Sequence, residues 1–289
     1  LNVVVLLEPD DTDTRTTLRR LEDQYDFERL TVPAMYPGEP NKPRALNYAY
    51  ERTTGEIVGV LDAEDIIAQD LCQRVSVELT SGYDFAQSRL DMVNEDDGWL
   101  NTMFRAEYGY WYETSISGFS NRDYPIPMAG TTCFFRRAVL DDISEKRIQK
   151  FGDPWDDEEW EWINDHGLDG LVPWDPNNVT EDFELGMFLW QEEYQFAYID
   201  SVTKGESPLT LDSWIKQRTR WQKGKVYTFK QLISSPPKGL FSKLHMYTQS
   251  AVPHIGAVNF SAMILVLLGA NLFRSYTPSS STLTVLNIS

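Results

Sequence analysis

The sequence predicts an α/β domain in which a mostly parallel sheet is flanked by helices. Short apolar runs alternate with segments of helical periodicity, which is the pattern of strands joined by covering helices. A length of 289 residues, of which 42% are hydrophobic and 13% aromatic, is sufficient for one large core. In sheets of this kind ligands bind beyond the carboxyl ends of the strands, so we expect the functional residues there.

Each strand is predicted from a short apolar run. The runs are residues 3–7, 27–32, 57–61, 83–87 and 196–201, and a further apolar stretch ends the irregular segment 125–135. Helical periodicity covers residues 14–25, 44–52, 70–79, 99–118, 180–194 and 211–232. We expect Asn41 to cap the second of these helices, with Pro43 in its first turn.

An acidic insertion rich in tryptophan interrupts this alternation at residues 150–175. Its tryptophans are Trp155, Trp160, Trp162 and Trp174. We interpret the insertion as a solvated loop whose indole rings anchor it to the body of the domain. A platform for a sugar ring is the alternative, because an indole face is large, rigid and apolar.

Charge is divided unevenly along the chain. The net charge is −18, yet residues 213–289 contain no Asp or Glu and nine Lys or Arg. Residues 1–212 therefore hold all 44 acidic residues against 17 basic ones, a net charge of −27. An acidic body of this kind repels phosphate chains, which argues against a nucleic-acid binder.

An uncharged apolar segment follows the basic one. Residues 251–273 contain no Lys, Arg, Asp or Glu, and their number suits a helix that spans a bilayer. Lys and Arg gather on the cytoplasmic side of such a span, so we expect a membrane-associated protein whose acidic body faces the cytoplasm. A buried helix or an interfacial one is the alternative.

The chain begins directly in a predicted strand, without a signal peptide or an initiating Met. We therefore expect it to be part of a longer protein. Its two cysteines, Cys72 and Cys133, are too few and too far apart for a disulfide framework or a zinc site.

Three carboxylates directly follow the apolar run at 57–61, namely Asp62, Glu64 and Asp65. Their mutual repulsion at the rim of a buried strand is relieved if a divalent cation binds there. Carboxylate oxygens are suitable ligands for Mg²⁺ or Mn²⁺. The alternative is a solvated turn whose negative charges favour the start of the next helix.

A second acidic group, Thr180-Glu181-Asp182, opens a predicted helix. Thr180 is suited to the cap position, which places Asp182 in the first turn, where the helix dipole favours its ionised form. A carboxylate that is held ionised in a site can act as a general base. An ordinary acidic first turn is the alternative.

The third group lies on the basic helix at 211–232. Gln217 is three residues before Arg220 and four before Trp221, so the three side chains share one helix face. A guanidinium binds phosphate oxygens in pairs, and an indole face can stack on a sugar ring. An amphipathic basic helix that lies on anionic lipid is the alternative, and both interpretations can hold on different faces.

These motifs, in this order, resemble those of the family 2 glycosyltransferases of the cellulose-synthase-like group. The resemblance rests on Asp-Ala-Glu-Asp at 62–65, Thr-Glu-Asp at 180–182 and Gln-x-x-Arg-Trp at 217–221. The runs Lys-Pro-Arg-Ala-Leu-Asn at 42–47 and Trp-Asp-Pro-Asn-Asn-Val at 174–179 are similar to those of its bacterial and archaeal membrane-bound members. It covers roughly residues 2–235.

The resemblance implies a GT-A fold, an inverting transfer, and a nucleoside-diphosphate sugar donor that usually carries UDP. It implies that Asp62 and Glu64 hold Mg²⁺ or Mn²⁺ and that Asp182 deprotonates the acceptor hydroxyl. The residues implied for the nucleotide and its diphosphate are Lys42, Asn47, Asp62, Gln217 and Arg220. Those implied for the acceptor are Gly130, Thr131, Thr132, Glu181 and Trp221.

The sequence departs from the family pattern near its beginning. The first strand of the family and the turn after it are absent, so we expect them upstream of Leu1. The turn after the next strand contains Glu8 and Asp10, and either one is a candidate contact for the base or the ribose. The metal pair is Asp62 with Glu64 rather than two Asp, and the acidic insertion is longer than usual.

The expected organisation has four parts. A GT-A catalytic domain covers residues 1–210, a basic interfacial segment with Gln-x-x-Arg-Trp covers 211–247, a transmembrane helix covers 248–275, and a tail covers 276–289.

The expected function is extension of a polysaccharide from a nucleotide sugar, without nucleic-acid partners. Transfer of a single sugar to a lipid-linked or other acceptor is one alternative. A non-catalytic, membrane-tethered module with the same fold is another.

Overall fold

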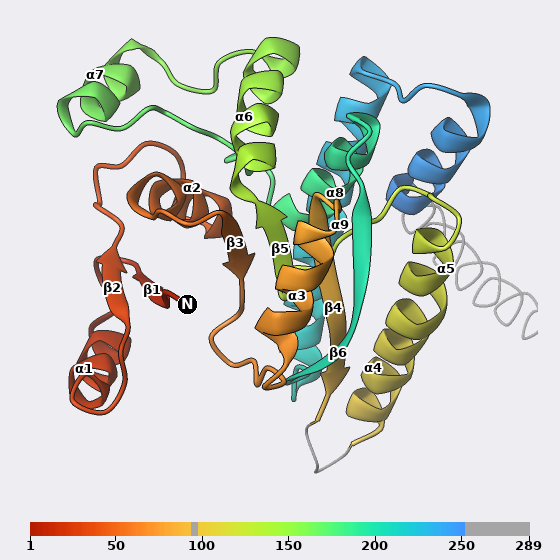
Figure 1. Ribbon diagram of the computed structural model, residues 1–289, viewed down its shortest axis with the longest axis horizontal. Helices are drawn as coiled ribbons and strands as arrows, with labels where there is room; N and C mark the ends of the chain where they lie inside the picture. Colours follow the sequence, from red (N-terminus) through yellow and green to blue (C-terminus); the bar gives the residue numbers. More distant parts are fainter. Residues whose placement is uncertain (94–97, 252–289) are drawn as a thin grey trace, which may run out of the picture.

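The computed structural model describes residues 1–93 and 98–251 (Figure 1). Within these ranges the strands form two sheets. The strands β1 (Val4–Leu7) and β2 (Glu28–Thr31) pair in parallel. A second sheet has the order β3-β5-β4-β6, and its strands are β3 (Ile57–Val60), β5 (Cys133–Arg136), β4 (Phe85–Met92) and β6 (Phe196–Gly205).

The predicted α/β class is confirmed, but the expectation of a mostly parallel sheet is wrong. Strand β5 runs antiparallel to both of its neighbours, β3 and β4, whereas β4 and β6 are parallel. The sheet is therefore mixed. A short apolar run carries no sign of strand direction, so the sequence pattern alone could not identify the reversed strand.

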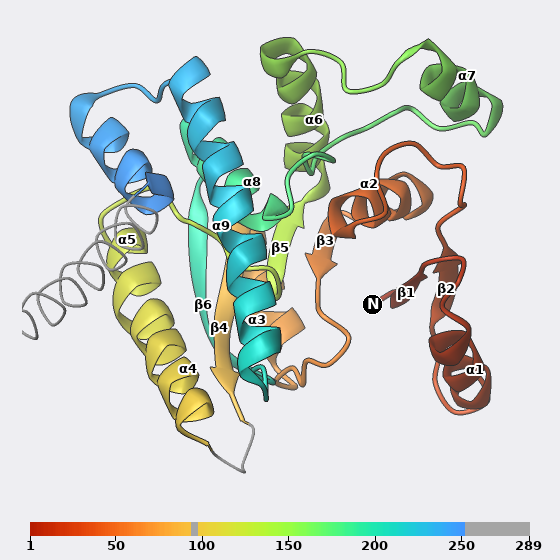
Figure 2. The same cartoon turned by 180° about the vertical axis from the view of Figure 1, so that it is seen from behind.

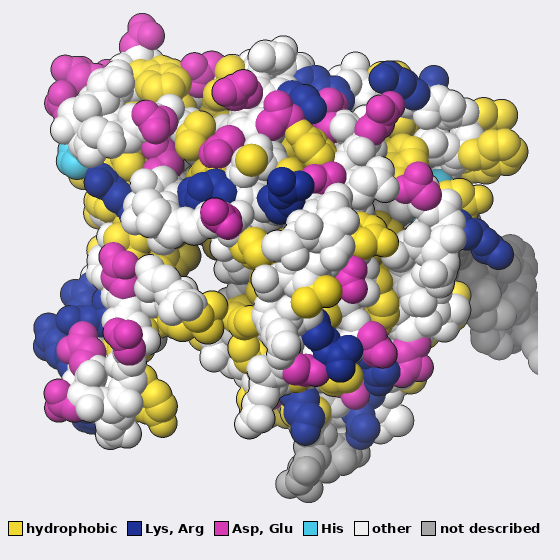
Figure 3. Space-filling model, in the orientation of Figure 1, with side chains coloured by type: hydrophobic (Ala, Val, Ile, Leu, Met, Phe, Trp, Pro, Cys, Tyr) yellow, Lys and Arg dark blue, Asp and Glu magenta, His cyan; other side chains and the backbone are white. Residues whose placement is uncertain are grey.

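The two sheets stand apart. Figures 1 and 3 show β1, β2 and α1 on one side of an opening and the four-stranded sheet on the other, joined by the chain that passes through α2. No hydrogen bonds between strands link the two sheets among the described residues. The strand expected upstream of Leu1 stays a prediction.

Helices cover the four-stranded sheet on both faces, with α3 on one and α8 and α9 on the other (Figures 1 and 2). Their bounds are α1 Thr12–Leu21, α2 Lys42–Arg52, α3 Leu71–Thr80, α4 Trp99–Gly109, α5 Ser117–Ser120, α6 Arg137–Phe151, α7 Asp157–Asp165, α8 Glu181–Gln191 and α9 Leu211–Ser234. A π-helical segment, Tyr110–Ile116, joins α4 to α5. Most of α6 was not predicted from the sequence.

The core has one layer on each face of this sheet. Leu71, Val75 and Leu79 repeat at helical spacing along α3 and pack on Phe134 and Ile199. The opposite layer is larger and joins apolar residues of α8 to the other side of the sheet, among them Phe85, Phe135, Leu185, Phe188 and Leu189. The short strands β3 and β5 are largely apolar, whereas β4 and β6 also carry polar side chains, and β6 alternates between buried and less buried positions.

The acidic insertion contains a helix, α7, which begins with a capping box formed by Asp156 and Glu159. Its indole rings face inward. Trp155 is buried, and Trp160 and Trp162 pack against the same cluster, which includes Tyr36 of the segment after β2. This packing ties the insertion to the part of the chain that carries β1 and β2.

A buried ion pair fixes α8 against α6. The guanidinium of Arg147 donates to both oxygens of Glu184 at 2.8 and 2.9 Å, and also to the carbonyl of Pro173 at 3.0 Å. The side chains of Arg147 and Glu184 are each 4% exposed, so the pair is almost entirely shielded from water. The pair therefore sets the direction from which the chain enters α8.

Helix α9 lies against the start of α8 at unusually close range. A Cβ atom on Gly224 would lie 2.6 and 2.7 Å from Thr180 Cγ2 and Cβ. The loop before α8 is also bonded to α9, because Asn178 donates to Thr228 at 3.0 Å and the Gln231 amide donates to Asp175 at 2.7 Å.

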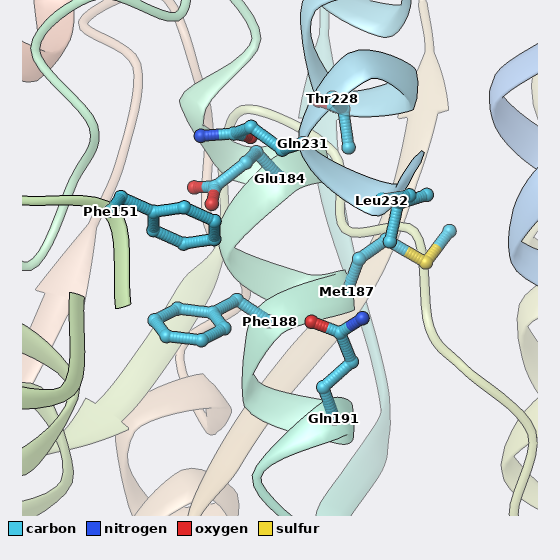
Figure 4. Close-up of a pocket in the computed structure, with 8 residues that line it drawn as sticks. All are labelled: Phe151, Glu184, Met187, Phe188, Gln191, Thr228, Gln231 and Leu232. Carbon is cyan, nitrogen blue, oxygen red and sulfur yellow. The ribbon is translucent and has the colours of Figure 1, made fainter. Parts of the chain in front are cut away.

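Figure 4 shows α8 and α9 farther along their contact, where they enclose a small cavity lined by Glu184, Met187, Thr228, Gln231 and Leu232 among others. Glu184 points into this cavity region rather than toward the start of α8. The cavity is therefore separate from the acidic residues at the beginning of the helix.

The predicted transmembrane helix at 248–275 lies almost entirely outside the described residues. Within 1–93 and 98–251, no helix is both long and apolar enough to cross a bilayer. The expected domain boundaries stay predictions.

We predict that Gly224→Ala destabilises the protein by about 2 kcal/mol, because the added methyl group overlaps Thr180 and forces α9 away from α8. The free energy of unfolding in denaturant measures this loss. Gly109→Ala in α4 is the matched control, since its Cβ would meet nothing within 4 Å. Equal stability of the two variants would contradict the close contact.

Candidate active site

The carboxylates that follow β3 are held by the loop before the neighbouring strand, β5. The backbone N–H of Asp62 donates to Thr131 Oγ1 at 3.0 Å, and the same hydroxyl donates to the carboxylate of Asp65. Asp62 is half-buried, whereas Glu64 is exposed. The loop at 130–132 therefore positions two of the three carboxylates.

Thr132 gives this loop its shape. Its φ of 55° is in the left-handed region, which is costly for a β-branched residue. Its side chain is fully buried and its hydroxyl donates to the carbonyl of Ser88 at 3.2 Å. Thr132 thus supports the loop from behind and does not face the site, although the resemblance implied an acceptor contact.

Lys42 reaches this loop from the start of α2. Asn41 caps the helix as predicted, accepting from the backbone N–H of Arg44 at 2.9 Å, and its amide donates to the carbonyl of Pro176 at 3.0 Å. The ammonium group of Lys42 donates to the Asp62 carboxylate and to the carbonyl of Gly130. Burial lowers the pKa of Lys42, but Asp62, Glu181 and Asp182 outweigh it and the net shift is upward.

The first turn of α8 brings the second acidic motif to the same place. An atom in the Cβ position of Gly130 would lie 3.6 Å from Asp182 Oδ2 and 3.7 Å from Lys42 Nζ. Asp62, Gly130, Lys42 and Asp182 therefore surround one small region. Thr180 occupies the cap position, but its hydroxyl bonds to Asn178 at 3.2 Å rather than to the helix.

Burial governs the protonation of both acids in this turn. It raises the pKa of Asp182, against the backbone N–H of Phe183 and the charges of Lys42 and Arg220, which lower it. Burial and the charge of Asp182 raise the pKa of Glu181 to about 8. At neutral pH Glu181 therefore holds a proton, while the charges of Lys42 and Arg220 favour the ionised form of Asp182.

Helix α9 supplies the third motif. Arg220 is exposed, yet it is close enough to lower the pKa of both Glu181 and Asp182. Gln217 Oε1 is buried and accepts no hydrogen bond from the part of the chain that is described. The structure thus places the face that carries these two residues toward the start of α8.

Trp221 is less open than the sequence suggested. The guanidinium carbon of Arg218 lies 4.6 Å from its ring centre, and Phe104 of α4 lies 6.4 Å away. Arg218 also forms a double hydrogen bond with Glu107 of α4. One face of the indole ring is therefore covered by a cation within the protein.

Two contributors were given no individual role from the sequence: Asp65, which was only one of three carboxylates at the expected cation site, and Lys225. Asp65 shares the hydroxyl of Thr131 with the backbone of Asp62. Burial lowers the pKa of Lys225, and the charge of Asp182 opposes that shift, so this lysine also interacts electrostatically with Asp182. Both could have been identified as site candidates from their positions, since Asp65 follows Glu64 directly and Lys225 lies four residues after Trp221.

Three predicted nucleotide contacts lie elsewhere. Asn47 is fully buried, and its amide is paired with the backbone of Trp174 at 2.8 and 3.1 Å. Glu8 is paired with the buried guanidinium of Arg44 at 3.4 Å, and Asp10 is exposed; both follow β1. The structure gives Asn47 a positioning role, and nucleotide contacts by Glu8 and Asp10 stay predictions.

The residues at the end of β3 suit a divalent cation bound together with a phosphate group. No cluster of three or more potential metal-binding side chains exists within 1–93 and 98–251. Mg²⁺ and similar ions, however, often take only one or two carboxylates and complete their shell with water and phosphate oxygens. Asp62 already binds one cation, the ammonium group of Lys42. Burial is the main cause of the raised pKa of Asp65, and the charges of Asp62 and Glu64 raise it further.

Comparison with known sequences identifies the family. The sequence model described as glycosyl transferase family group 2 matches residues 57–287, most of the chain. The chain belongs to this family. The finer assignment to the cellulose-synthase-like group stays a prediction.

Two curated family 2 relatives resemble the chain over most of its length. Beta-monoglucosyldiacylglycerol synthase of Synechocystis sp. is 23% identical over 284 residues, which are 96% of this chain and 53% of the relative. Probable glycosyltransferase YdaM of Bacillus subtilis is 19% identical over 247 residues, 81% of this chain and 50% of the relative. The chain thus spans about half the length of these relatives.

A solved glycosyltransferase structure supports the GT-A fold. The mannosyltransferase PcManGT from Pyrobaculum calidifontis, in complex with GDP-Man and Mn²⁺, superposes with a TM-score of 0.56 at 16% identity. The match covers 96% of this chain and 74% of that protein. The predicted fold is therefore confirmed, with a mixed sheet in place of the expected mostly parallel one.

We predict that Glu181→Gln makes the stability of this glycosyltransferase less dependent on pH. The pKa of Glu181 is about 8 in the folded protein against an ordinary 4.5, so its contribution is complete below pH 4.5 and is lost as the pH rises toward about 8. The variant cannot ionise. As the pH rises from 4.5 to about 8, the melting temperature of the variant should rise relative to that of the parent by about 5 °C. A constant difference would contradict the burial of Glu181.

Proposed function

We propose that the chain is the catalytic domain of an inverting, metal-dependent glycosyltransferase that uses a nucleoside-diphosphate sugar. The observation that carries this proposal is the meeting of Asp62, Asp182 and Arg220 around Lys42 and Gly130, although they come from three distant segments. Carboxylates that bind a cation, a base, and a guanidinium are the groups that displacement of a diphosphate requires.

Asp182 is the proposed general base. It is buried enough to be a competent proton acceptor, while Lys42 and Arg220 favour its ionised form. The acceptor hydroxyl gives its proton to Asp182 as its oxygen attacks the anomeric carbon from the face opposite the diphosphate. One direct displacement inverts the configuration at that carbon.

The leaving group needs positive charge. Arg220 supplies two or more N–H donors for phosphate oxygens, and Gln217 offers a buried carbonyl oxygen for a hydroxyl group of a bound sugar. The divalent cation, Mg²⁺ or Mn²⁺, is proposed to be held by Asp62 and to neutralise charge that develops on the diphosphate. Because the leaving group is stabilised in this way, no acidic side chain has to protonate it.

Two acceptors are proposed. A growing polysaccharide follows from the Gln-x-x-Arg-Trp motif at 217–221. A lipid that receives a single sugar is the second candidate, because one curated relative is a beta-monoglucosyldiacylglycerol synthase. The donor, which we propose to be a UDP-sugar, and the linkage are left to experiment. Incubation with labelled donor followed by sizing of the product separates the two acceptors.

We further propose that the domain works at the cytoplasmic surface of a membrane. The exposed side of α9 supports this, since Leu211, Ile215 and Ile233 are about half exposed or more. A row of lysines, Lys216, Lys223 and Lys230, lies beside them on the same helix. Apolar residues bordered by lysines are suited to an anionic lipid surface.

We predict that Asp182→Asn lowers the rate of sugar transfer at least about 100-fold near neutral pH, the usual contribution of a general base. Glu181→Gln, its matched control in the same turn, should retain most of the rate, because Glu181 already carries a proton below about pH 8. Initial rates with labelled donor and Mn²⁺ measure both. A loss in Glu181→Gln as large as that in Asp182→Asn would remove the assignment of the base.

The non-catalytic alternative makes the opposite prediction. A tethered module without activity would neither transfer nor hydrolyse the donor, with Mn²⁺ or with Mg²⁺. Turnover of the donor would exclude this alternative.

A further inference from the structure

The ammonium group of Lys42 has two oxygen partners from separate parts of the chain. It donates to a carboxylate oxygen of Asp62, after β3, and to the carbonyl oxygen of Gly130, in the loop before β5. The side chains of Lys42 and Asp62 are 33% and 36% exposed, so the pair is accessible from solvent. Carboxylate and carbonyl oxygens are also the atoms that hard divalent cations bind.

We infer that Asp62 has two cationic partners in turn, the ammonium group of Lys42 in the donor-free protein and the divalent cation when the nucleotide sugar is bound. This inference rests on the proposed metal-dependent function. Because the two cations compete for the same carboxylate, the free metal ion binds weakly. The ion therefore enters together with the diphosphate, whose negative charge attracts Lys42 away from Asp62.

Lys42 has another anionic partner within reach when it leaves Asp62. The Cβ position of Gly130 lies 3.7 Å from Lys42 Nζ and 3.6 Å from Asp182 Oδ2, so both charged groups border Gly130, and the charge of Asp182 already acts on Lys42. The backbone of Lys42 stays in place, because the neighbouring Asn41 caps α2 and bonds to Pro176. Only the flexible four-carbon side chain has to move.

The charges around Asp62 determine whether the loss of Lys42 strengthens or weakens the binding of a divalent cation. Asp62, Glu64 and Asp65 lie within four residues, and in the donor-free protein Lys42 is the cation that contacts Asp62 among the residues described. Removal of that ammonium leaves the carboxylates without their counter-charge. Free Mn²⁺ should then bind more tightly to the variant than to the parent, which is the opposite of the effect of losing a supporting residue.

The test is the affinity for Mn²⁺ alone, measured from the electron paramagnetic resonance signal of the free ion in the absence of nucleotide. Lys42→Met should bind Mn²⁺ about tenfold more tightly than the parent, the scale of one charge pair at a partly exposed site. Lys42→Arg keeps the charge and should bind like the parent. Lys223→Met, which removes an exposed lysine of α9, is the matched control and should also be unchanged.

Unchanged or weaker Mn²⁺ binding in Lys42→Met would overturn the inference, as would equal tightening in Lys42→Arg. Thermal unfolding of each variant establishes that it is folded. If the parent transfers sugar with Mn²⁺ while Lys42→Met binds the ion no better, only the inference fails. If parent and variant bind no Mn²⁺, with or without a nucleoside diphosphate, the inference and the metal-dependent function fail together.

Discussion

Two adjacent carboxylic acids lie in the first turn of α8: Glu181, which is buried, and Asp182, which is partly buried. Much of the surrounding structure compensates for their charge. An isolated buried carboxylate is costly, so it either takes up a proton or finds a cation. Both outcomes occur here. Glu181 holds a proton up to about pH 8, and Asp182 has Lys42 and Arg220 as cationic neighbours. Two neighbouring acids of one helix turn are thereby given different properties.

The remaining architecture holds those cations at the acidic pair. Asn41 fixes the start of α2, from which Lys42 extends, through hydrogen bonds to Arg44 and Pro176. The absence of a side chain at Gly224 allows α9 to lie against Thr180, immediately before the two acids. Arg147 and Glu184 fix α8 from its other side by a buried double hydrogen bond. The site therefore depends on contacts that take no part in its chemistry.

Several features of the site could be predicted from the sequence because they depend on local spacing. The shared face of Gln217, Arg220 and Trp221 follows from helical periodicity, and the start of α2 follows from Asn41 and Pro43. The carboxylates after an apolar run were expected at the end of a strand, and Asp62 follows β3. Local rules of this kind do not depend on how the strands are later arranged.

Other features depend on tertiary contacts that spacing does not encode. Strand β5 runs antiparallel to β3 and β4, and an apolar run is the same in either direction. An amide such as Asn47 can bond to a ligand or to the backbone, and only the packing of Trp174 decides between them. The contact between Lys42 and Asp62 joins residues 20 positions apart. Trp221 is covered by Arg218, three residues before it, which periodicity permitted but did not require.

The central claim is that burial raises the pKa of both acids and that the charge of Asp182 raises the pKa of Glu181 further. A titration of individual carboxyl groups tests it most directly. Carbon-13 NMR of the labelled side-chain carboxyls, assigned with Glu181→Gln and Asp182→Asn, follows each group as the pH is varied. The account predicts that Glu181 titrates near pH 8 and that Asp182 titrates below it. Titration of Glu181 near its ordinary value of 4.5 would contradict the account.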